Sequence, residues 1–230
     1  MSRNIIIGAY LCSKVDPQRD RYTPTDDFGY IEGWYNSILT TNNKGVILHD
    51  SLSSEFVKRY ENLALSFVKV DISKIPYTIN DCRFIIFNEY LQKNIFNNVF
   101  ITDISDVVFK KDPFELVAEK LLVGSESVVK KDFWWSKKYI NEVYPCYPFW
   151  NEPLLNCGIL GGNYKMVKEV LEIMVNEIYK NPVREYFIDM MVFNYVIHSN
   201  FYGKYFTGSP LHTVFKNYDT ANIDAYIIHK

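Results

Sequence analysis

Hydrophobic and polar residues follow two different patterns along the first half of the chain. Short apolar runs rich in β-branched residues predict buried strands. They lie at 4–9, 46–49, 65–70, 98–102 and 121–124. Between these runs, apolar residues recur at spacings of three and four over 31–38 and 80–93, which predicts helices. Strands that alternate with helices predict an α/β fold with a mostly parallel central sheet flanked by helices.

The second half of the chain is less regular but contains two helical patterns. Asn163 is a predicted N-cap, and apolar residues over 166–178 form one stripe that ends before Pro182. Residues 187–198 are apolar on most sides, which predicts a second, buried helix. The shorter elements expected are a strand at 156–162 that breaks at a glycine pair, strands at 205 and 226–228, and a loop with some helix at 134–150. No repeat or linker is visible, so we predict one domain over residues 1–230.

The composition is that of a globular protein of ordinary charge. Hydrophobic residues make up 48% of the 230 residues and charged residues 23%, which excludes a disordered chain. The longest stretch without a charged residue runs over 190–203, shorter than the roughly 20 residues that span a bilayer. A net charge of −2 without a basic block disfavours nucleic acid as a partner. Aromatic residues reach 17%, either because the core uses Phe and Tyr in place of Leu or because tyrosines line a wet pocket.

The cysteine pattern indicates a reducing compartment. Cys12, Cys82, Cys146 and Cys157 form no C-x-x-C pair and no cluster with zinc spacing. In a chain that can build an adequate core, we interpret them as buried thiols. The N-terminal apolar run is short and lacks a signal-peptide cleavage site, so we interpret it as a strand and expect the protein in the cytoplasm.

Two carboxylates that follow the apolar run at 98–102 are the clearest candidates for chemistry. Asp103 and Asp106 lie at the carboxyl end of this predicted strand, the edge where open α/β sheets bind ligands. Two carboxylates held close together repel each other unless one is protonated or a cation lies between them. Oxygen ligands suit Mg²⁺ or Mn²⁺, and such an ion usually also binds the phosphates of a substrate. The alternative is that Asp103 only caps a turn and Asp106 is only solvated.

Standard catalytic signatures are missing from the sequence. There is no G-x-x-x-x-G-K-[ST] phosphate loop, no H-E-x-x-H zinc motif and no G-x-S-x-G nucleophile elbow. P-loop NTPases, zincins and most α/β-hydrolases are therefore excluded. A phosphatase of the D-x-D type would need Asp at position 105, where the chain has Ser105.

Four segments spread over nearly the whole chain share a further pattern. They are the first predicted strand at 5–10, the helix start at 80–84, the acidic segment at 100–114, and the segment at 155–162 with the spacing N-x-G-x-x-G-G. Together they resemble the GT-A-fold glycosyltransferases that use nucleotide sugars, especially small family-8-like bacterial enzymes and transferase domains of large algal (chlorella) viruses. The chain departs from the family's D-x-D motif, since Asp103 and Asp106 are separated by two residues. If the chain is viral, its expected location is the host cytoplasm.

The resemblance implies a GT-A-like, Rossmann-related single domain and a set of site residues. The implied metal ligands are Asp103, Asp106 and the near-terminal His229. The implied nucleotide contacts are Gly8, Ala9, Tyr10, Arg83, Asp103 and Lys230. The implied sugar contacts are Asn156, Gly161 and Gly162. The chain stops directly after Lys230, which leaves open that it is one domain of a longer protein.

Asp189 is a candidate sugar-binding and catalytic residue on separate evidence. It lies in the apolar helix predicted at 187–198, where a carboxylate needs a partner. It either binds sugar hydroxyls or acts as a base toward the acceptor. The alternative is a helix residue paired with a nearby Arg or Lys.

These observations predict a glycosyltransferase that depends on Mn²⁺ or Mg²⁺ and moves a sugar from a nucleotide diphosphate donor, UDP first, to a glycan hydroxyl. The C-terminal His-Lys pair slightly favours retention of configuration. One rival is a metal-dependent hydrolase of a phosphate or glycoside that uses Asp103 and Asp106. The other is a non-catalytic carbohydrate-binding module that uses the aromatic segment around 133–150. The base, the donor sugar, the acceptor and the oligomeric state stay open.

Overall fold

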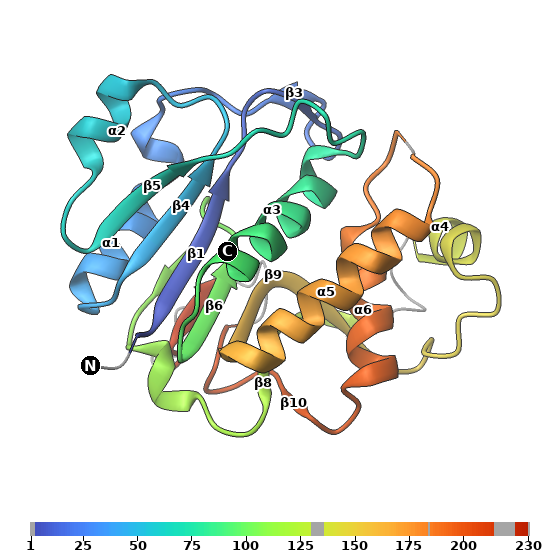
Figure 1. Cartoon of the computed structure of the whole chain (residues 1–230). Coiled ribbons are helices and arrows are strands. Elements are labelled where there is room, and N and C mark those ends of the chain that lie inside the picture. The colour runs from blue at the N-terminus through green and yellow to red at the C-terminus, as the bar shows by residue number, and fades with distance from the viewer. Residues whose placement is uncertain (1–2, 130–135, 184, 214–223, 230) are drawn as a thin grey trace.

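A computed structural model describes residues 3–129, 136–183, 185–213 and 224–229. The strands of its central sheet are β1 (Ile5–Tyr10), β4 (Gly45–His49), β5 (Leu65–Lys69), β6 (Asn98–Thr102), β8 (Leu121–Val129), β9 (Pro153–Asn163) and β10 (Tyr205–Phe206). In the described part of the chain these seven strands lie in the order β10-β8-β9-β6-β1-β4-β5 (Figure 1). Strands from both halves of the sequence share this one sheet, so the described chain forms a single domain.

All strands of the sheet run in one direction except β9. β1 pairs in parallel with β4 and β6, β4 with β5, and β10 with β8. β9 is antiparallel to both of its neighbours, β6 and β8. The predicted α/β class with a mostly parallel sheet is confirmed.

Helices cover both faces of the sheet. They are α1 (Glu32–Thr40), α2 (Ser54–Tyr60), α3 (Ile79–Lys93), α4 (Ser136–Val143), α5 (Tyr164–Lys180) and α6 (Asp189–Asn200). Consecutive side chains of a strand point to opposite faces, so Val99 and Ile101 of β6 join the core under α3, α5 and α6. Phe100 points the other way, into the core under α1 and α2. Figure 1 shows α3 and α5 in front of the sheet and α1 behind it.

Most predicted elements are confirmed to within a few residues. The strand at 98–102 coincides with β6, and Asn163 caps α5 by accepting the N–H of Lys165 at 3.0 Å. The predicted break at Gly161 and Gly162 is wrong, because both glycines pair with β6 and the strand continues to Asn163. The elements that were not predicted include α2, β7 (Val107–Phe109) and the hairpin of β2 (Val15–Asp16) and β3 (Arg21–Tyr22).

The structure shows the surroundings of the aromatic segment and of the four cysteines. The rings of Tyr144 and Tyr195 stack with centroids 4.0 Å apart, and Tyr147 packs beside them, so these described rings belong to a packed cluster. All four cysteines are free thiols, but the prediction that all are buried is wrong for Cys146, which is exposed. The location in a reducing compartment stays a prediction. Among the described helices, none combines the length and apolarity that crossing a membrane requires.

The topology singles out one edge of the sheet. The strand order changes direction at β1, since β4 and β5 lie on one side of it and β6 lies on the other. Open α/β sheets bind ligands at such a switch point, beyond the carboxyl ends of the strands. The loops that follow β1 and β6 therefore define where the site should be, and Asp103 is the first residue after β6.

Candidate functional site

Two carboxylates and one imidazole meet at the carboxyl end of β6. Asp103 and Asp106 lie in the loop between β6 and β7, and His229 ends β11 (Ile227–His229), which pairs antiparallel with β7. Potential ligand atoms of these three residues all lie within 4.8 Å of one another. The Oδ2 atom of Asp103 is 4.0 Å from Nε2 of His229. The structure thus brings together the three metal ligands that the resemblance implied, from the middle and the C-terminal end of the described chain.

Two glycines make room for this cluster. A Cβ atom on Gly158 would lie 2.5 Å from Oδ2 of Asp103 and 2.9 Å from Nε2 of His229. A Cβ atom on Gly8 would lie 2.0 Å from the side chain of Ile104, so the absent side chain lets the loop after β6 close over β1. The carbonyl of Gly158 also accepts the N–H of Asp103 at 3.0 Å. Gly158 therefore shapes the space in front of the ligand atoms, and Gly8 shapes the loop that carries them.

The electrostatics of the cluster fit a divalent cation. Burial and then the nearby charge of Asp103 raise the pKa of Asp106 to about 7. Burial lowers the pKa of His229 to about 4, so its ring is neutral near pH 7 and keeps a lone pair for a metal. Two carboxylates with one neutral imidazole form a mixed oxygen and nitrogen donor set that Mn²⁺ accepts. A cation between the two carboxylates would also remove the repulsion that raises the pKa of Asp106.

A second cluster of charges adjoins the first. The guanidinium of Arg83, on α3, donates to Oδ1 of Asp103 and, over 2.9 Å, to Oδ2 of Asp189 at the start of α6. It also donates to the sulfur of Cys157 at 3.2 Å. The thiol of Cys157 faces the same oxygen of Asp189 at 3.6 Å, and burial raises the pKa of this thiol well above its ordinary value. Asp189 is only 2% exposed, and its partner is Arg83, as the alternative interpretation of Asp189 expected.

The side chain of Asn156 is hydrogen-bonded to its own strand, β9, and to the neighbouring strand, β8. Its Oδ1 accepts the N–H of Gly158 at 2.7 Å, and its Nδ2 donates to Glu126 of β8 at 2.7 Å. These two bonds fix the strand where Gly158 passes the metal-ligand cluster. The direct sugar contact proposed for Asn156 stays a prediction.

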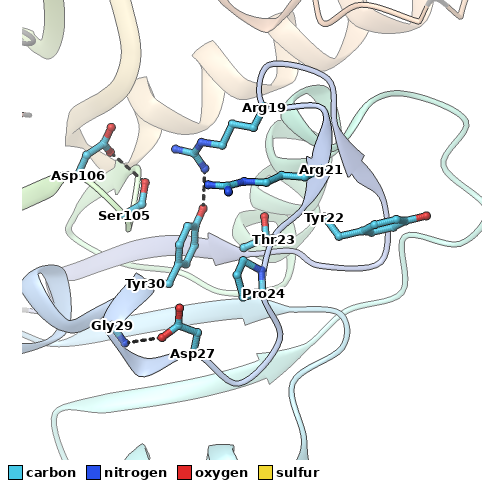
Figure 2. Close-up of a pocket in the computed structure, with 10 residues that line it drawn as sticks. All are labelled: Arg19, Arg21, Tyr22, Thr23, Pro24, Asp27, Gly29, Tyr30, Ser105 and Asp106. Carbon is cyan, nitrogen blue, oxygen red and sulfur yellow. Dashed lines mark hydrogen bonds between the residues drawn. The ribbon is translucent and has the colours of Figure 1, made fainter.

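A cavity of about 370 Å³ adjoins Asp106, between the β2–β3 hairpin and the loop that follows β6. Arg19, Arg21 and Tyr30 contribute to its lining. The guanidinium of Arg19 donates to the Tyr30 hydroxyl at 3.4 Å. Figure 2 shows Arg19 and Tyr30 on the side of Asp106, whereas the ring of Tyr22 points away from it. The sequence did not point to these residues, because the two hairpin strands have two residues each and Tyr30 lies in a three-residue helical turn, so neither carries a periodic apolar pattern.

Several residues expected at the site have other surroundings. Tyr10 is fully buried, and its hydroxyl donates to the carbonyls of Pro24 and Asp27 rather than facing the cavity. Ala9 packs against the core. A Cβ atom on Gly161 would lie 2.2 Å from the ring of Phe100, so the space left by this glycine is filled by the core.

Gly162 pairs with Val99, near the start of β6, whereas Gly158 lies level with Asp103 at its end. At about 3.3 Å per residue, the pair at 161–162 is therefore about 10 Å or more from the metal-ligand cluster. Lys230 lies outside the described residues.

Comparisons with known proteins place the fold. No protein-family model matches the sequence, and no curated protein matches it. Among solved structures, the chain is similar to the bifunctional glycosyltransferase WbbM in its apo form, with a TM-score of 0.58 and 16% identity over 99% of this chain. It is similar to the galactosyltransferase LgtC bound to donor and acceptor sugar analogues, with a TM-score of 0.58 and 13% identity over 98% of this chain. An active-site mutant of LgtC gives a TM-score of 0.56 at 12% identity.

The fold is GT-A-like. The chain spans 45% of the WbbM chain and 86% of the LgtC chain. At identities of 12–16% these similarities establish the fold and not the activity. What the protein does must be argued from its own site.

Proposed function

We propose that the protein is a divalent-metal-dependent glycosyltransferase that takes its sugar from a nucleotide diphosphate donor. One observation carries the proposal: the ligand atoms of Asp103, Asp106 and His229 lie within 4.8 Å of one another at the sheet edge where ligands bind. The GT-A-like fold supports it, since LgtC is a galactosyltransferase captured with donor and acceptor sugar analogues.

Asp103, Asp106 and His229 would hold the cation, with Mn²⁺ as the first choice and Mg²⁺ as the second. Bound there, a divalent ion supplies positive charge that stabilises the diphosphate leaving group as the glycosidic bond breaks. Arg83 keeps one oxygen of Asp103 occupied, so the other oxygen stays turned toward His229. The protein thus fixes the orientation of its first ligand before any substrate binds.

The cavity beside Asp106 offers room and charge for the nucleotide. Its volume of about 370 Å³ falls within the range of small-molecule sites. Arg19 and Arg21 can donate in pairs to phosphate oxygens, and the ring of Tyr30 offers a face to a base. We assign the nucleotide to this cavity and take UDP as the first candidate.

The sugar would lie between the metal-ligand cluster and the Arg83–Asp189 pair. Asp189 accepts from Arg83 through Oδ2 and from the N–H of Met190 through Oδ1 at 2.7 Å. A carboxylate has about four acceptor positions, so Asp189 keeps capacity for sugar hydroxyls. With both oxygens already engaged, Asp189 is better suited to orient the sugar than to move a proton. This favours retention of configuration, with a glycan hydroxyl as acceptor.

Release of free nucleotide from a panel of UDP-, GDP- and CDP-sugars tests the proposal. With water in place of the glycan, transfer yields free sugar and nucleoside diphosphate, so turnover can be followed before the acceptor is known. We expect release from one nucleotide class with Mn²⁺, none with EDTA, and a loss in Asp106→Asn. Asp112→Asn is the matched control, because Asp112 lies just after β7 and caps a short helical turn instead of joining the cluster.

The two rivals predict other results. A hydrolase of phosphates or glycosides would act on simple aryl phosphates or glycosides with no nucleotide preference. A carbohydrate-binding module would bind glycans in EDTA and release nothing. Either result, without metal-dependent nucleotide release, would overturn the proposal. A proton NMR spectrum of the first sugar product distinguishes retention from inversion.

A further inference from the structure

Helix α6, which begins with Asp189, has no N-cap of its own. The residue at the N-cap position is Ile188, and it makes no side-chain capping bond. The first N–H groups of a helix lack partners within the helix and need acceptors from elsewhere. For a buried helix start, water cannot supply them, and both Ile188 and Asp189 are 2% exposed.

The missing acceptor comes from α3. Oδ1 of Asp81 accepts the N–H of Ile188 at 3.0 Å. The other oxygen, Oδ2, accepts the hydroxyl of Thr78, the N-cap of α3, at 2.7 Å. Thr78 thereby fixes the orientation of the Asp81 carboxylate, which is itself only 2% exposed. Asp81, which caps α6, is therefore held in place by Thr78, the N-cap of α3.

Asp81 and Arg83 contact the same first turn of α6 in two ways. Asp81 binds the backbone at Ile188, and Arg83 binds the Asp189 side chain over 2.9 Å. Residues two apart leave a helix in different directions, so the two contacts constrain α6 independently. Together they decide where the Asp189 carboxylate lies relative to α3 and to Asp103.

We propose that Asp81 is a positioning residue for recognition of the donor sugar, which it serves by capping α6 and so fixing Asp189 opposite Arg83. This inference rests on the function proposed above, because it assumes that Asp189 contacts the sugar. It concerns the sugar and not the nucleotide, since α6 contributes no residue to the cavity beside Asp106.

The role needs an acceptor oxygen at position 81 rather than a charge. Burial and then the charge of Asp189 raise the pKa of Asp81 to about 7, so a neutral form of this side chain lies close in energy. An amide also offers an oxygen to the N–H of Ile188. Asp81→Asn should therefore preserve the arrangement, whereas Asp81→Ala removes it.

The experiment compares Asp81→Ala and Asp81→Asn with the wild type, using the nucleotide sugar that the wild type turns over and Mn²⁺. We expect Asp81→Ala to raise the donor KM about tenfold or more, as leaving one buried N–H without its acceptor does. The affinity for the sugar-free nucleotide with Mn²⁺ should stay within about threefold of the wild type. Asp81→Asn should stay within about threefold in both measurements.

Asn163→Ala is the matched control. It also removes a helix N-cap, but the one of α5, which follows the end of β9. It should lower the melting temperature without changing the donor KM. If Asp81→Ala does not fold, Thr78→Val replaces it, because loss of the hydroxyl frees the Asp81 carboxylate to turn. That variant should raise the donor KM by about threefold or more with the nucleotide affinity unchanged.

The proposed function and the role of Asp81 are overturned by different results. A wild type that releases no nucleotide with Mn²⁺ overturns the proposed function. A wild type that turns over its donor while Asp81→Ala keeps the wild-type donor KM overturns the role of Asp81 and leaves the function standing. The role is equally overturned if Asp81→Asn is as impaired as Asp81→Ala, or if sugar-free nucleotide affinity falls in parallel with donor affinity.

Discussion

Gly158→Ala should strongly weaken metal-dependent nucleotide binding while leaving most of the fold intact. The new Cβ would lie 2.5 Å from Oδ2 of Asp103 and 2.7 Å from Cε1 of His229. The backbone at Gly158 is not among the positions with positive φ, so an alanine meets no conformational strain and only space decides the outcome. The methyl group can be accommodated only if the two ligands separate.

The size of the effect follows from these distances. A relaxed carbon–oxygen contact is about 3.5 Å, so Asp103 must retreat by about 1 Å. Metal sites tolerate deviations of only about 0.2 Å in their ligand distances. We therefore expect the Mn²⁺-dependent affinity for nucleotide to fall about 100-fold, the upper range for disturbed metal surroundings. The free energy of unfolding should fall by about 1–3 kcal/mol, as for other overpacked sites.

Calorimetry of nucleotide binding with Mn²⁺, together with thermal melting, measures both effects. Gly161→Ala is the control on the same strand, because its Cβ would lie 2.2 Å from the ring of Phe100 in the core. That variant should lose stability but bind metal and nucleotide normally while folded. If Gly158→Ala binds Mn²⁺ and nucleotide as tightly as the wild type, the space in front of Asp103 and His229 is not the metal site.

Four further predictions concern charged groups. Arg83→Leu leaves the buried carboxylate of Asp189 and the half-buried carboxylate of Asp103 without their guanidinium and should lower the free energy of unfolding by about 3–5 kcal/mol, measured by urea denaturation. The pKa of Asp106 is raised to about 7, and only its deprotonated form binds a cation, so Mn²⁺ affinity should rise about tenfold from about pH 6 to about pH 8. Because the pKa of Asp106 is higher in the folded than in the unfolded protein, the free energy of unfolding of the metal-free protein should fall as pH rises from the ordinary Asp pKa toward 7. Replacing Arg19 and Arg21 together by alanine should weaken nucleotide binding about tenfold or more, with a smaller dependence on salt than in the wild type.

The sequence predicted best the elements whose pattern is local. An unbroken apolar run followed at once by Asp103 locates β6 to the residue, because a buried strand needs apolar side chains on both faces. The helix α2 was missed because its seven residues bury only Phe56. The β2–β3 hairpin was missed because two-residue strands carry no periodicity.

Within the site, the sequence supplied the residue types but not their neighbours. It named Asp103, Asp106 and His229, but among the glycines of β9 it singled out Gly161 and Gly162, as sugar contacts, and not Gly158. Which glycine of β9 lies beside Asp103 depends on the register of β9 against β6, and residue spacing does not encode register. The bond from Ile188 to Asp81 joins residues 107 positions apart and leaves no local signal in either helix.

The most direct test of the proposed function is calorimetric titration of UDP, GDP, CDP and ADP into the protein, each with Mn²⁺ and with EDTA. We predict that one nucleotide binds selectively, only with Mn²⁺, and that this binding is lost in Asp103→Ala and in His229→Ala. If no nucleotide binds under either condition, or if binding is equally strong in EDTA and in both variants, the proposed metal-dependent glycosyltransferase site is contradicted.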